Sequence, residues 1–401
     1  MEKKWEFPQL SLEERDRRWR GIRSAMVKRR LDCLLIYADS GHWHSYSADM
    51  RYVTQIGHPG DEGIVVFPRE GDVTVCPNFG NQHREYRINM QNWVKDVREG
   101  WQKGQDPTSL AIKRVKELGL ESRPIGVTGL GGLSAPEGRM PHGTFLRIQK
   151  AFPNLVNASD ILEEMRLIKS EEEIKFIEKA VEISDQVIDT IIEKARPGMR
   201  GYELYAWAMH TLYSNGSEPP MFLFDHGPAP WHSNPLPDWR AIQKGDVILT
   251  VISPRYGGYY GHAHQCFALG EPRKEFYDLF EKALESFKKG LAVLRPGITV
   301  QEATDVFVEP VKKAGYYWSN PPFHGLGLKM PDYPMSGLAG MDKSYHGDII
   351  IEEGMVFALE GTAQMLDEAM GVSIGNAAVI TATGVRYLSK RKPEFIIIKP
   401  K

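Results

Sequence analysis

Two histidines lie two residues apart in the segment "YYGHAHQCF", residues 259–267. A strand places alternate side chains on one face, so His262 and His264 would project into the same space while Tyr259 points to the other face. Paired imidazoles can chelate a divalent ion, move protons near neutral pH, or serve as hydrogen-bonded structural groups. A metal site would need further ligands from elsewhere in the chain. Metal binding, catalysis with substrate binding, and a structural role all remain open from this pair.

Two more candidates lie near the C-terminal end. His324 follows Phe323 in "PPFHGLGL", where glycines would let a ligand approach the backbone closely, although a loop histidine is the plain alternative. Glu360 ends the apolar run of "EEGMVFALEG". A carboxylate buried in a strand has to be paired, ligating or protonated, because burial penalises its charged form. The position of Glu360 therefore favours a functional role.

A proline-rich segment, "GPAPWHSNPLPDW", carries the remaining candidate. Its prolines restrict the backbone, so Trp231 and His232 would be presented from a stiff support. An aromatic wall beside a histidine is typical of a pocket lining, whereas an exposed loop histidine is the plain alternative.

Composition sets the class of protein. A chain of 401 residues predicts two domains, and a formal net charge of -2 offers no attraction for nucleic acid or an anionic membrane. We expect no signal peptide, since the N-terminal residues are charged throughout. We also expect no membrane span in the chain. Three scattered cysteines without a CxxC pair argue against disulfides and a thiolate zinc site, so we expect a cytoplasmic protein.

The elements that must hold these residues fall into two patterns. A charged helix over residues 11–30 and short apolar runs such as "CLLIYAD" and "EGIVVFP" predict an α/β domain over residues 1–160. A capping box at Ser170 and Glu173 then starts a long amphipathic helix. Helices alternating with hairpin-like strands predict an α+β domain over residues 161–401, with a curved antiparallel sheet covered by helices.

Several motifs together resemble the pita-bread superfamily, which contains prolidase, aminopeptidase P, methionine aminopeptidase and creatinase. They include "RLIKSEEEIKFIEKA", "PWHSNP", "KGDVILTVISPRYGGYYGHAHQCFALGEP", "FHGLGL", "EEGMVFALEG" and "GVSIGNAAVITATG", and they cover nearly the whole chain. The resemblance implies a small N-terminal α/β domain, a C-terminal pita-bread domain and a homodimer.

The resemblance also implies a ligand set, which this chain changes. Metallopeptidases of the superfamily hold two ions with two Asp, one His and two Glu. In this sequence the two Asp positions fall on Val251 and His262 and the last Glu falls on Gly375, whereas His324 and Glu360 match. Bridging carboxylates hold two hard cations together, so we expect neither a dimetal centre nor aminopeptidase activity.

Creatinase is the relevant comparison, because it resembles these peptidases in fold, works without a metal and hydrolyses a C–N bond. Its general acid/base matches His232, and its two site glutamates fall on His264 and Glu360. We therefore predict a metal-independent, cofactor-free hydrolase of a C–N bond in a small molecule. The catalytic residues would be His232, His324 and Glu360, and substrate would contact the side chains of His262, His264, Tyr259, Trp231 and Phe323.

Three alternatives remain. The same acid and base could run a β-elimination, which would make the protein a lyase. His262, His264, His324 and Glu360 could instead hold one divalent transition metal. A pita-bread domain can also lose catalysis and act as a binding protein.

Overall fold

A computed structural model gives the fold, and the chain separates into two compact units, Met1–Arg166 and Leu167–Lys401. The boundary drawn from the sequence was residue 160. The structure describes residues 6–39, 47–57, 61–78, 88–100, 104–133, 138–231, 236, 238–318, 320–337, 343–367 and 369–399. Among the described helices, none has the length and apolar character needed to cross a membrane.

The N-terminal unit is a six-stranded sheet in the order β4-β3-β2-β1-β5-β6. Its central strand β1 pairs antiparallel with β2 and parallel with β5, so the sheet is mixed. The strands are β1 (Cys33–Ala38), β2 (Gly63–Pro68), β3 (Thr74–Pro77), β4 (Asp96–Val97), β5 (Ile125–Val127) and β6 (Leu155–Asn157).

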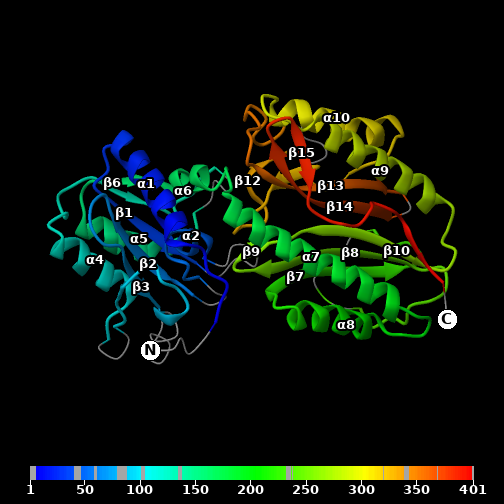
Figure 1. Ribbon diagram of the computed structural model, residues 1–401, viewed down its shortest axis with the longest axis horizontal. Coiled ribbons are helices and arrows are strands. Elements are labelled where there is room, and N and C mark those ends of the chain that lie inside the picture. The colour runs from blue at the N-terminus through cyan, green and yellow to red at the C-terminus, as the bar shows by residue number, and fades with distance from the viewer. Residues whose placement is uncertain are drawn as a thin grey trace. The chain divides into compact units, whose positions relative to one another are not determined.

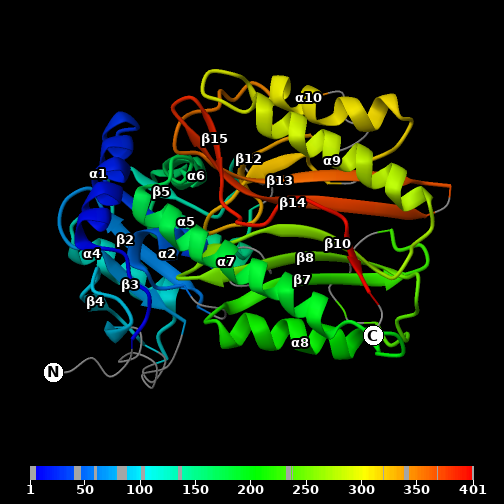
Figure 2. The same cartoon turned by 45° about the vertical axis from the view of Figure 1, so that its right-hand side comes forward.

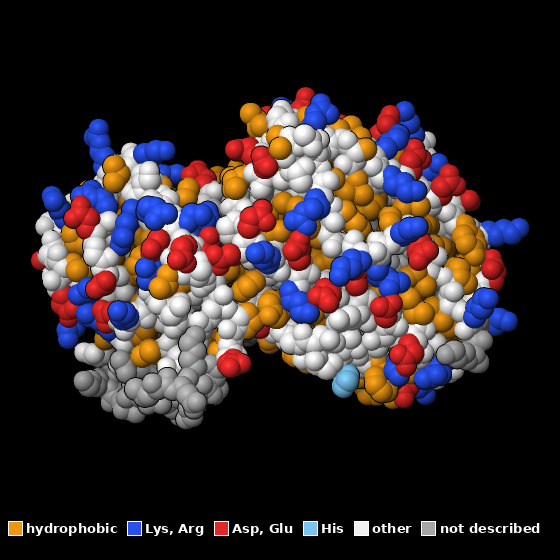
Figure 3. Space-filling model, viewed as in Figure 1, with side chains coloured by type: hydrophobic (Ala, Val, Ile, Leu, Met, Phe, Trp, Pro, Cys, Tyr) orange, Lys and Arg blue, Asp and Glu red, His pale blue; other side chains and the backbone are white. Residues whose placement is uncertain are grey.

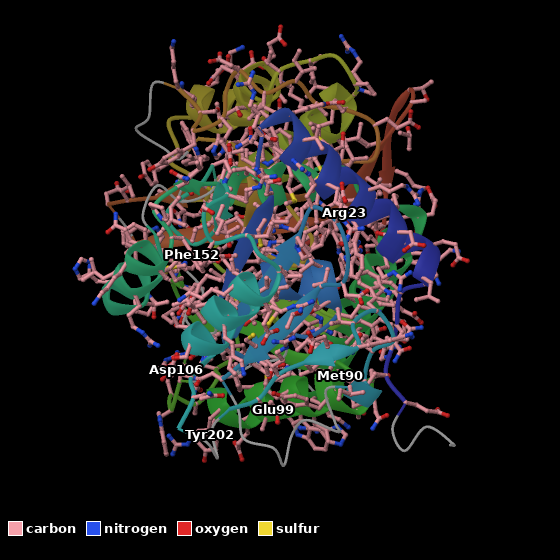
Figure 4. All side chains as sticks on the ribbon, turned by 90° about the vertical axis from the view of Figure 1, so that its left-hand side faces the viewer. Arg23, Met90, Glu99, Asp106, Phe152 and Tyr202 are labelled. Carbon is pink, nitrogen blue, oxygen red and sulfur yellow. The ribbon has the colours of Figure 1, made fainter. Side chains whose placement is uncertain are left out.

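Helices cover this sheet on both sides. Figure 4 shows α1, which carries Arg23, and α5, which ends before Phe152, on opposite sides of the strands. Local sequence explains where helices begin: the Ser11 hydroxyl accepts from the Glu14 N–H at the start of α1. The helices are α1 (Leu12–Lys28), α2 (Ala48–Thr54), α4 (Pro107–Glu117), α5 (His142–Ala151) and α6 (Ser159–Met165).

The C-terminal unit is built on a ten-stranded sheet whose main path runs β12-β11-β13-β14-β10-β8-β7, with all of these neighbours antiparallel. Off this path, β15 pairs with β14, β16 with β10 and β9 with β8. The strands are β7 (Glu218–Gly227), β8 (Val247–Tyr256), β9 (Tyr259–Tyr260), β10 (Ala263–Leu269), β11 (Phe323–Gly325), β12 (Asp332–Met335), β13 (Val356–Met365), β14 (Met370–Thr381), β15 (Gly384–Tyr387) and β16 (Ile396–Ile398).

Two helix pairs cover the sheet of this unit, one over β7, β8 and β10 and the other over β13 and β14 (Figures 1 and 2). The first pair is α7 (Glu171–Lys194) with α8 (Gly201–Ser214), and the second is α9 (Glu275–Val293) with α10 (Val300–Lys313). The predicted capping box of Ser170 and Glu173 forms at the start of α7. The predicted fold class, an α/β domain followed by an α+β pita-bread domain, is confirmed.

Candidate metal centre

Three neighbouring strands of the C-terminal unit position the candidate residues. His264 on β10 and Glu360 on β13 are separated by β14, and both pair with the same residue, Gly375. Neighbouring strands lie about 4.8 Å apart, so the two side chains have to meet across an intervening strand. Gly375 permits this because it has no side chain. A Cβ built at Gly375 would lie only 2.1 Å from the carbonyl oxygen of Leu359.

Three imidazole rings converge on one oxygen of Glu360. The Nε2 atoms of His262 and His324 each lie 3.1 Å from Glu360 Oε1, and the Nε2 atom of His264 lies 3.5 Å from it. His324 comes from β11, which pairs with β13, and His262 precedes β10 directly. All four side chains are at most 5% exposed. The cluster is therefore a buried group of nitrogen and oxygen donors around one point.

Partners on the far sides of two rings fix their orientation. The Nδ1 atom of His324 donates to the carbonyl oxygen of Gly325 at 2.8 Å, so in the neutral ring Nε2 presents a lone pair toward Glu360. The Nδ1 atom of His262 lies 3.0 Å from the hydroxyl of Ser253 and 3.1 Å from the sulfur of Met330. Such outer partners are typical of histidines that bind metals.

The electrostatics of the cluster favour a neutral His262 ring and an ionised Glu360 carboxylate. Burial lowers the pKa of His262 to about 4, and the hydrogen bond with Glu360 offsets this only in part. Burial alone would raise the pKa of Glu360, but the charge of His264 and the three imidazole contacts lower it well below its usual value of 4.5. Glu360 is thus a carboxylate. Of the three states expected of this buried carboxylate, the contacts with the three imidazoles correspond to the paired one.

Two buried polar atoms of the cluster have no hydrogen-bond partner among the described residues: Glu360 Oε2 and His264 Nδ1. Each such atom costs about 1–3 kcal/mol unless something satisfies it. One ligand atom from each of His262, His264 and Glu360 lies within 4.8 Å of the others. Tetrahedral ligands at 2.0–2.1 Å from an ion lie about 3.3 Å apart. The distances from Glu360 Oε1 to the three Nε2 atoms, 3.1–3.5 Å, are close to this value, although His324 is not part of the group within 4.8 Å. Three imidazoles and one carboxylate are a donor set that suits a divalent transition metal.

The structure places the predicted aromatic contacts away from this point. The hydroxyl of Tyr259 donates to Glu173 Oε1 at 3.0 Å. Phe323 packs against Phe307 and Phe357 in the hydrophobic core under α9 and α10. Adjacent residues of a strand point to opposite faces, which explains why Phe323 turns away while His324 joins the cluster.

Trp231 and His232 have different outcomes. The carbonyl oxygen of Trp231 accepts a hydrogen bond from Gln364 Nε2 at 3.1 Å, and its indole is partly exposed. His232 lies outside the described residues, so its catalytic role stays a prediction.

Ser253 and Met330 are site residues that sequence reasoning missed. Ser253 lies two residues beyond Val251 on β8, and the alternation of side chains along that strand was a signal that could have found it. Met330 approaches from the segment that follows β11, and no periodicity in the sequence points to it.

Comparison with known proteins identifies the family. Residues 175–382 match the model of metallopeptidase family M24, and residues 18–168 match the creatinase/prolidase N-terminal domain. The chain therefore belongs to metallopeptidase family M24. Peptidases cleave a C–N bond by hydrolysis, so the predicted class of enzyme, a hydrolase acting on C–N bonds, is confirmed at the level of the family.

Individual relatives agree with the family. The chain is 28% identical over 302 residues to an Xaa-Pro dipeptidase of Pyrococcus horikoshii, a match that covers 73% of this chain and 79% of the relative. An Xaa-Pro dipeptidase of Pyrococcus furiosus is 29% identical over 243 residues, or 59% of this chain and 67% of the relative. The crystal structure of the prolidase from Pyrococcus horikoshii has a TM-score of 0.76 at 23% identity and covers 95% of this chain and 100% of that one. An X-Pro aminopeptidase from Thermotoga maritima has a TM-score of 0.79 at 21% identity, covering 95% and 99%.

These findings overturn one central prediction. The prediction of a metal-independent, cofactor-free hydrolase, set apart from the dimetal aminopeptidases, is wrong, because the chain belongs to a family of metallopeptidases and resembles Xaa-Pro dipeptidases. The physical reason for the error is visible in the cluster. The comparison with the family's ligands counted Val251, His262 and Gly375 as losses, yet His262 and His264 are themselves good metal ligands and converge on Glu360.

Proposed function

We propose that this protein is a metal-dependent hydrolase of an amide-type C–N bond in a small, peptide-like substrate. In this proposal His262, His264, His324 and Glu360 hold a divalent transition-metal ion. The observation that carries the proposal is the convergence of three imidazole nitrogens on one carboxylate oxygen at 3.1–3.5 Å. The Xaa-Pro dipeptidase relatives support a dipeptide-sized substrate.

The chain's own residues divide the work. A divalent ion held by these four side chains would supply a Lewis acid for the amide carbonyl and would lower the pKa of a water molecule toward neutrality. The carbonyl of Gly325 and the hydroxyl of Ser253 fix the rings of His324 and His262 from behind. His264 Nδ1 is free to donate a hydrogen bond to an oxygen of the substrate. His232, the predicted acid/base, would return a proton to the leaving nitrogen.

The proposal also covers the setting in which the enzyme works. Cys33, Cys76 and Cys266 are buried free thiols, and burial raises the pKa of each to about 12, which supports a reducing, cytoplasmic compartment. On the face drawn in Figure 3, basic and acidic side chains are intermixed, which supports a small-molecule substrate over nucleic acid. The homodimer implied by the pita-bread resemblance is part of the proposal, and light scattering of the purified protein tests it.

Metal analysis tests the centre directly. The purified chain is stripped with a chelator, reloaded with Zn²⁺, Mn²⁺ or Co²⁺ and desalted before elemental analysis. We expect at least about one tightly held ion per chain. His324→Ala should lower retention, whereas His210→Ala, at an exposed histidine on α8, should not. Less than about a tenth of an ion per reloaded chain would overturn the proposal.

Activity is tested on the same preparations. A panel of Xaa-Pro dipeptides and other small amides is followed by mass spectrometry in ¹⁸O-labelled water. Hydrolysis places one labelled oxygen in the acid product, and chelation should abolish the reaction. Turnover that continues undiminished after the metal is removed would contradict the proposed role of the cluster.

A further inference from the structure

A row of buried polar atoms continues from the cluster along β13. Thr362 Oγ1 and Gln364 Oε1 have no hydrogen-bond partner in the described part of the chain, as is also the case for Glu360 Oε2. Residues 360, 362 and 364 alternate along one strand and therefore share a face of the sheet. Thr362 and Gln364 are only 4% and 3% exposed. Native proteins seldom leave such groups unsatisfied, so three in succession point to a ligand that satisfies them.

The chemistry of the row is fixed by the orientation of Gln364. Its Nε2 donates to the carbonyl oxygen of Trp231 at 3.1 Å, which leaves Oε1 as the atom without a partner. Oε1 of Gln364 and Oε2 of Glu360 can only accept hydrogen bonds, and the hydroxyl of Thr362 can accept one. Among the described residues, the hydrogen-bond and ion-pair partners of these three side chains include no Lys or Arg. A ligand that donates N–H or O–H hydrogens fits this row, and a carboxylate does not.

The position of the row along β13 sets how far its side chains lie from Glu360. Two residues of a strand span about 7 Å, so Thr362 lies about 7 Å and Gln364 about 13 Å along β13 from Glu360. The segment at Trp231 closes the far end, since the backbone N–H of Gly371, the cross-strand partner of Gln364, donates to the carbonyl of Pro230. A Cβ built at Gly371 would lie 2.7 Å from the carbonyl oxygen of Trp231. The row therefore has a definite end.

We propose that Thr362 and Gln364 are specificity-determining residues that bind a hydrogen-bond-donating group of the substrate, with an amino group as the best match. This inference rests on the proposed function, which places the substrate bond to be cleaved at Glu360 and the three histidines. The substrate class it names is a small amide that carries an amino group about 7–13 Å from the bond that is cleaved.

The test compares two probes of matched size, 1,7-diaminoheptane and 1-aminooctane, which differ only in an amino group in place of a methyl. Binding to the zinc-loaded chain is measured by isothermal titration calorimetry. The diamine should bind at least tenfold more tightly. Thr362→Val and Gln364→Met should each weaken diamine binding roughly tenfold and leave the affinity for aminooctane within about twofold. The zinc content of both variants should equal that of the wild type.

Thr250→Val is the matched control. Thr250 is a buried threonine on β8 whose hydroxyl donates to the carbonyl of Gln265. It lies three positions from Ser253, which faces His262, so its side chain points to the opposite face of the strand. It should change neither probe's affinity. Equal affinity of the wild type for the two probes, or equal weakening of both by Thr362→Val and Gln364→Met, would overturn the inference. If the protein fails the metal and hydrolysis tests but still binds the diamine more tightly, the amino-binding role of Thr362 and Gln364 is supported and the proposed function is not.

Discussion

Two buried charge clusters, one in each unit, differ in how completely their polar atoms are paired. In the N-terminal unit Arg18 donates to Glu14 at 2.6 Å and to the carbonyl of Tyr52 at 3.0 Å, and its guanidinium lies over the rings of Tyr52 and Trp93. Arg17 donates to both oxygens of Glu14. No buried side-chain polar atom of Arg18 or Glu14 lacks a hydrogen-bond partner among the described residues, and the cluster ties α1 to α2.

The histidine cluster of the C-terminal unit has the opposite character. Three rings compete for one oxygen of Glu360, while Glu360 Oε2 and His264 Nδ1 lack partners among the described residues. A cluster that serves only stability seldom keeps such atoms, because each costs about 1–3 kcal/mol. The difference shows that buried charge alone does not mark a functional site. The informative observation is buried charge whose polar atoms remain unsatisfied.

The largest expected effect separates the two clusters by function. Glu360→Gln keeps the shape of the side chain but removes the negative charge that a cation requires, so we expect metal affinity and kcat/KM to fall at least 100-fold. Thermal unfolding should change little, since a neutral amide is easier to bury than a carboxylate. Elemental analysis and steady-state kinetics measure both quantities. A variant that keeps its metal and full turnover would show that the cluster is structural after all.

The second prediction is that a change in the N-terminal cluster lowers stability and leaves metal binding and activity unchanged. Arg18→Met removes a buried cation and leaves Glu14 with only Arg17, so we expect the free energy of unfolding to fall by about 3 kcal/mol. Metal content and turnover per folded chain should stay at wild-type values. Denaturant titration measures the first and the assays above the second. Loss of metal in correctly folded Arg18→Met would break the proposed division between a stabilising and a functional cluster.

A smaller effect on metal affinity is expected from Ser253, the hydrogen-bond partner of a histidine in the cluster. Ser253→Ala removes the hydroxyl that faces His262 Nδ1 at 3.0 Å, and loss of such a partner should weaken metal binding about tenfold. Competition with a chelator gives the affinity. Ser184→Ala, at a buried serine of α7 that donates to the carbonyl of Val181, is the matched control and should leave metal affinity unchanged. Equal affinities for the two variants would remove Ser253 from the site.

Sequence predicts the parts of this site that depend on local geometry. The capping box at Ser170 and the shared face of His262 and His264 follow from turn chemistry and from alternation along a strand, and both appear in the structure. His324 and Glu360 were assigned to the same site through family resemblance, since no local pattern relates β11 to β13.

The rest depends on pairing between distant strands. Glu360 and His264 meet because β14 lies between β13 and β10 and presents Gly375 to both. Sequence order gives no access to that arrangement, so Gly375 was read as a lost ligand instead of the residue that leaves room for contact. The pairing of Tyr259 with Glu173 also needed the position of α7 over β9.

The smallest expected effect concerns a third cluster, in which a carboxylate is fully paired as in the N-terminal unit. Burial alone would raise the pKa of Asp246, but His226, Arg240 and the backbone N–H of Gln243 lower it to about 2 from 3.8. A lowered pKa in the folded state means that the stabilisation is present above pH 4 and is lost as the pH falls toward 2. We expect a loss of about 1 kcal/mol over that range, because Arg240 is partly exposed.

Urea unfolding between pH 5 and pH 2.5 checks this value for wild type and Asp246→Asn. The variant should be less stable at pH 5 and should lose less stability on acidification, whereas Asp278→Asn, at an exposed position of α9, should follow the wild type. Parallel curves for wild type and Asp246→Asn would mean that pairing at Asp246 contributes no pH-dependent stability. Because both oxygens of Asp246 are paired, as those of Glu14 are, such a result would weaken the link between a fully paired carboxylate and a stabilising role.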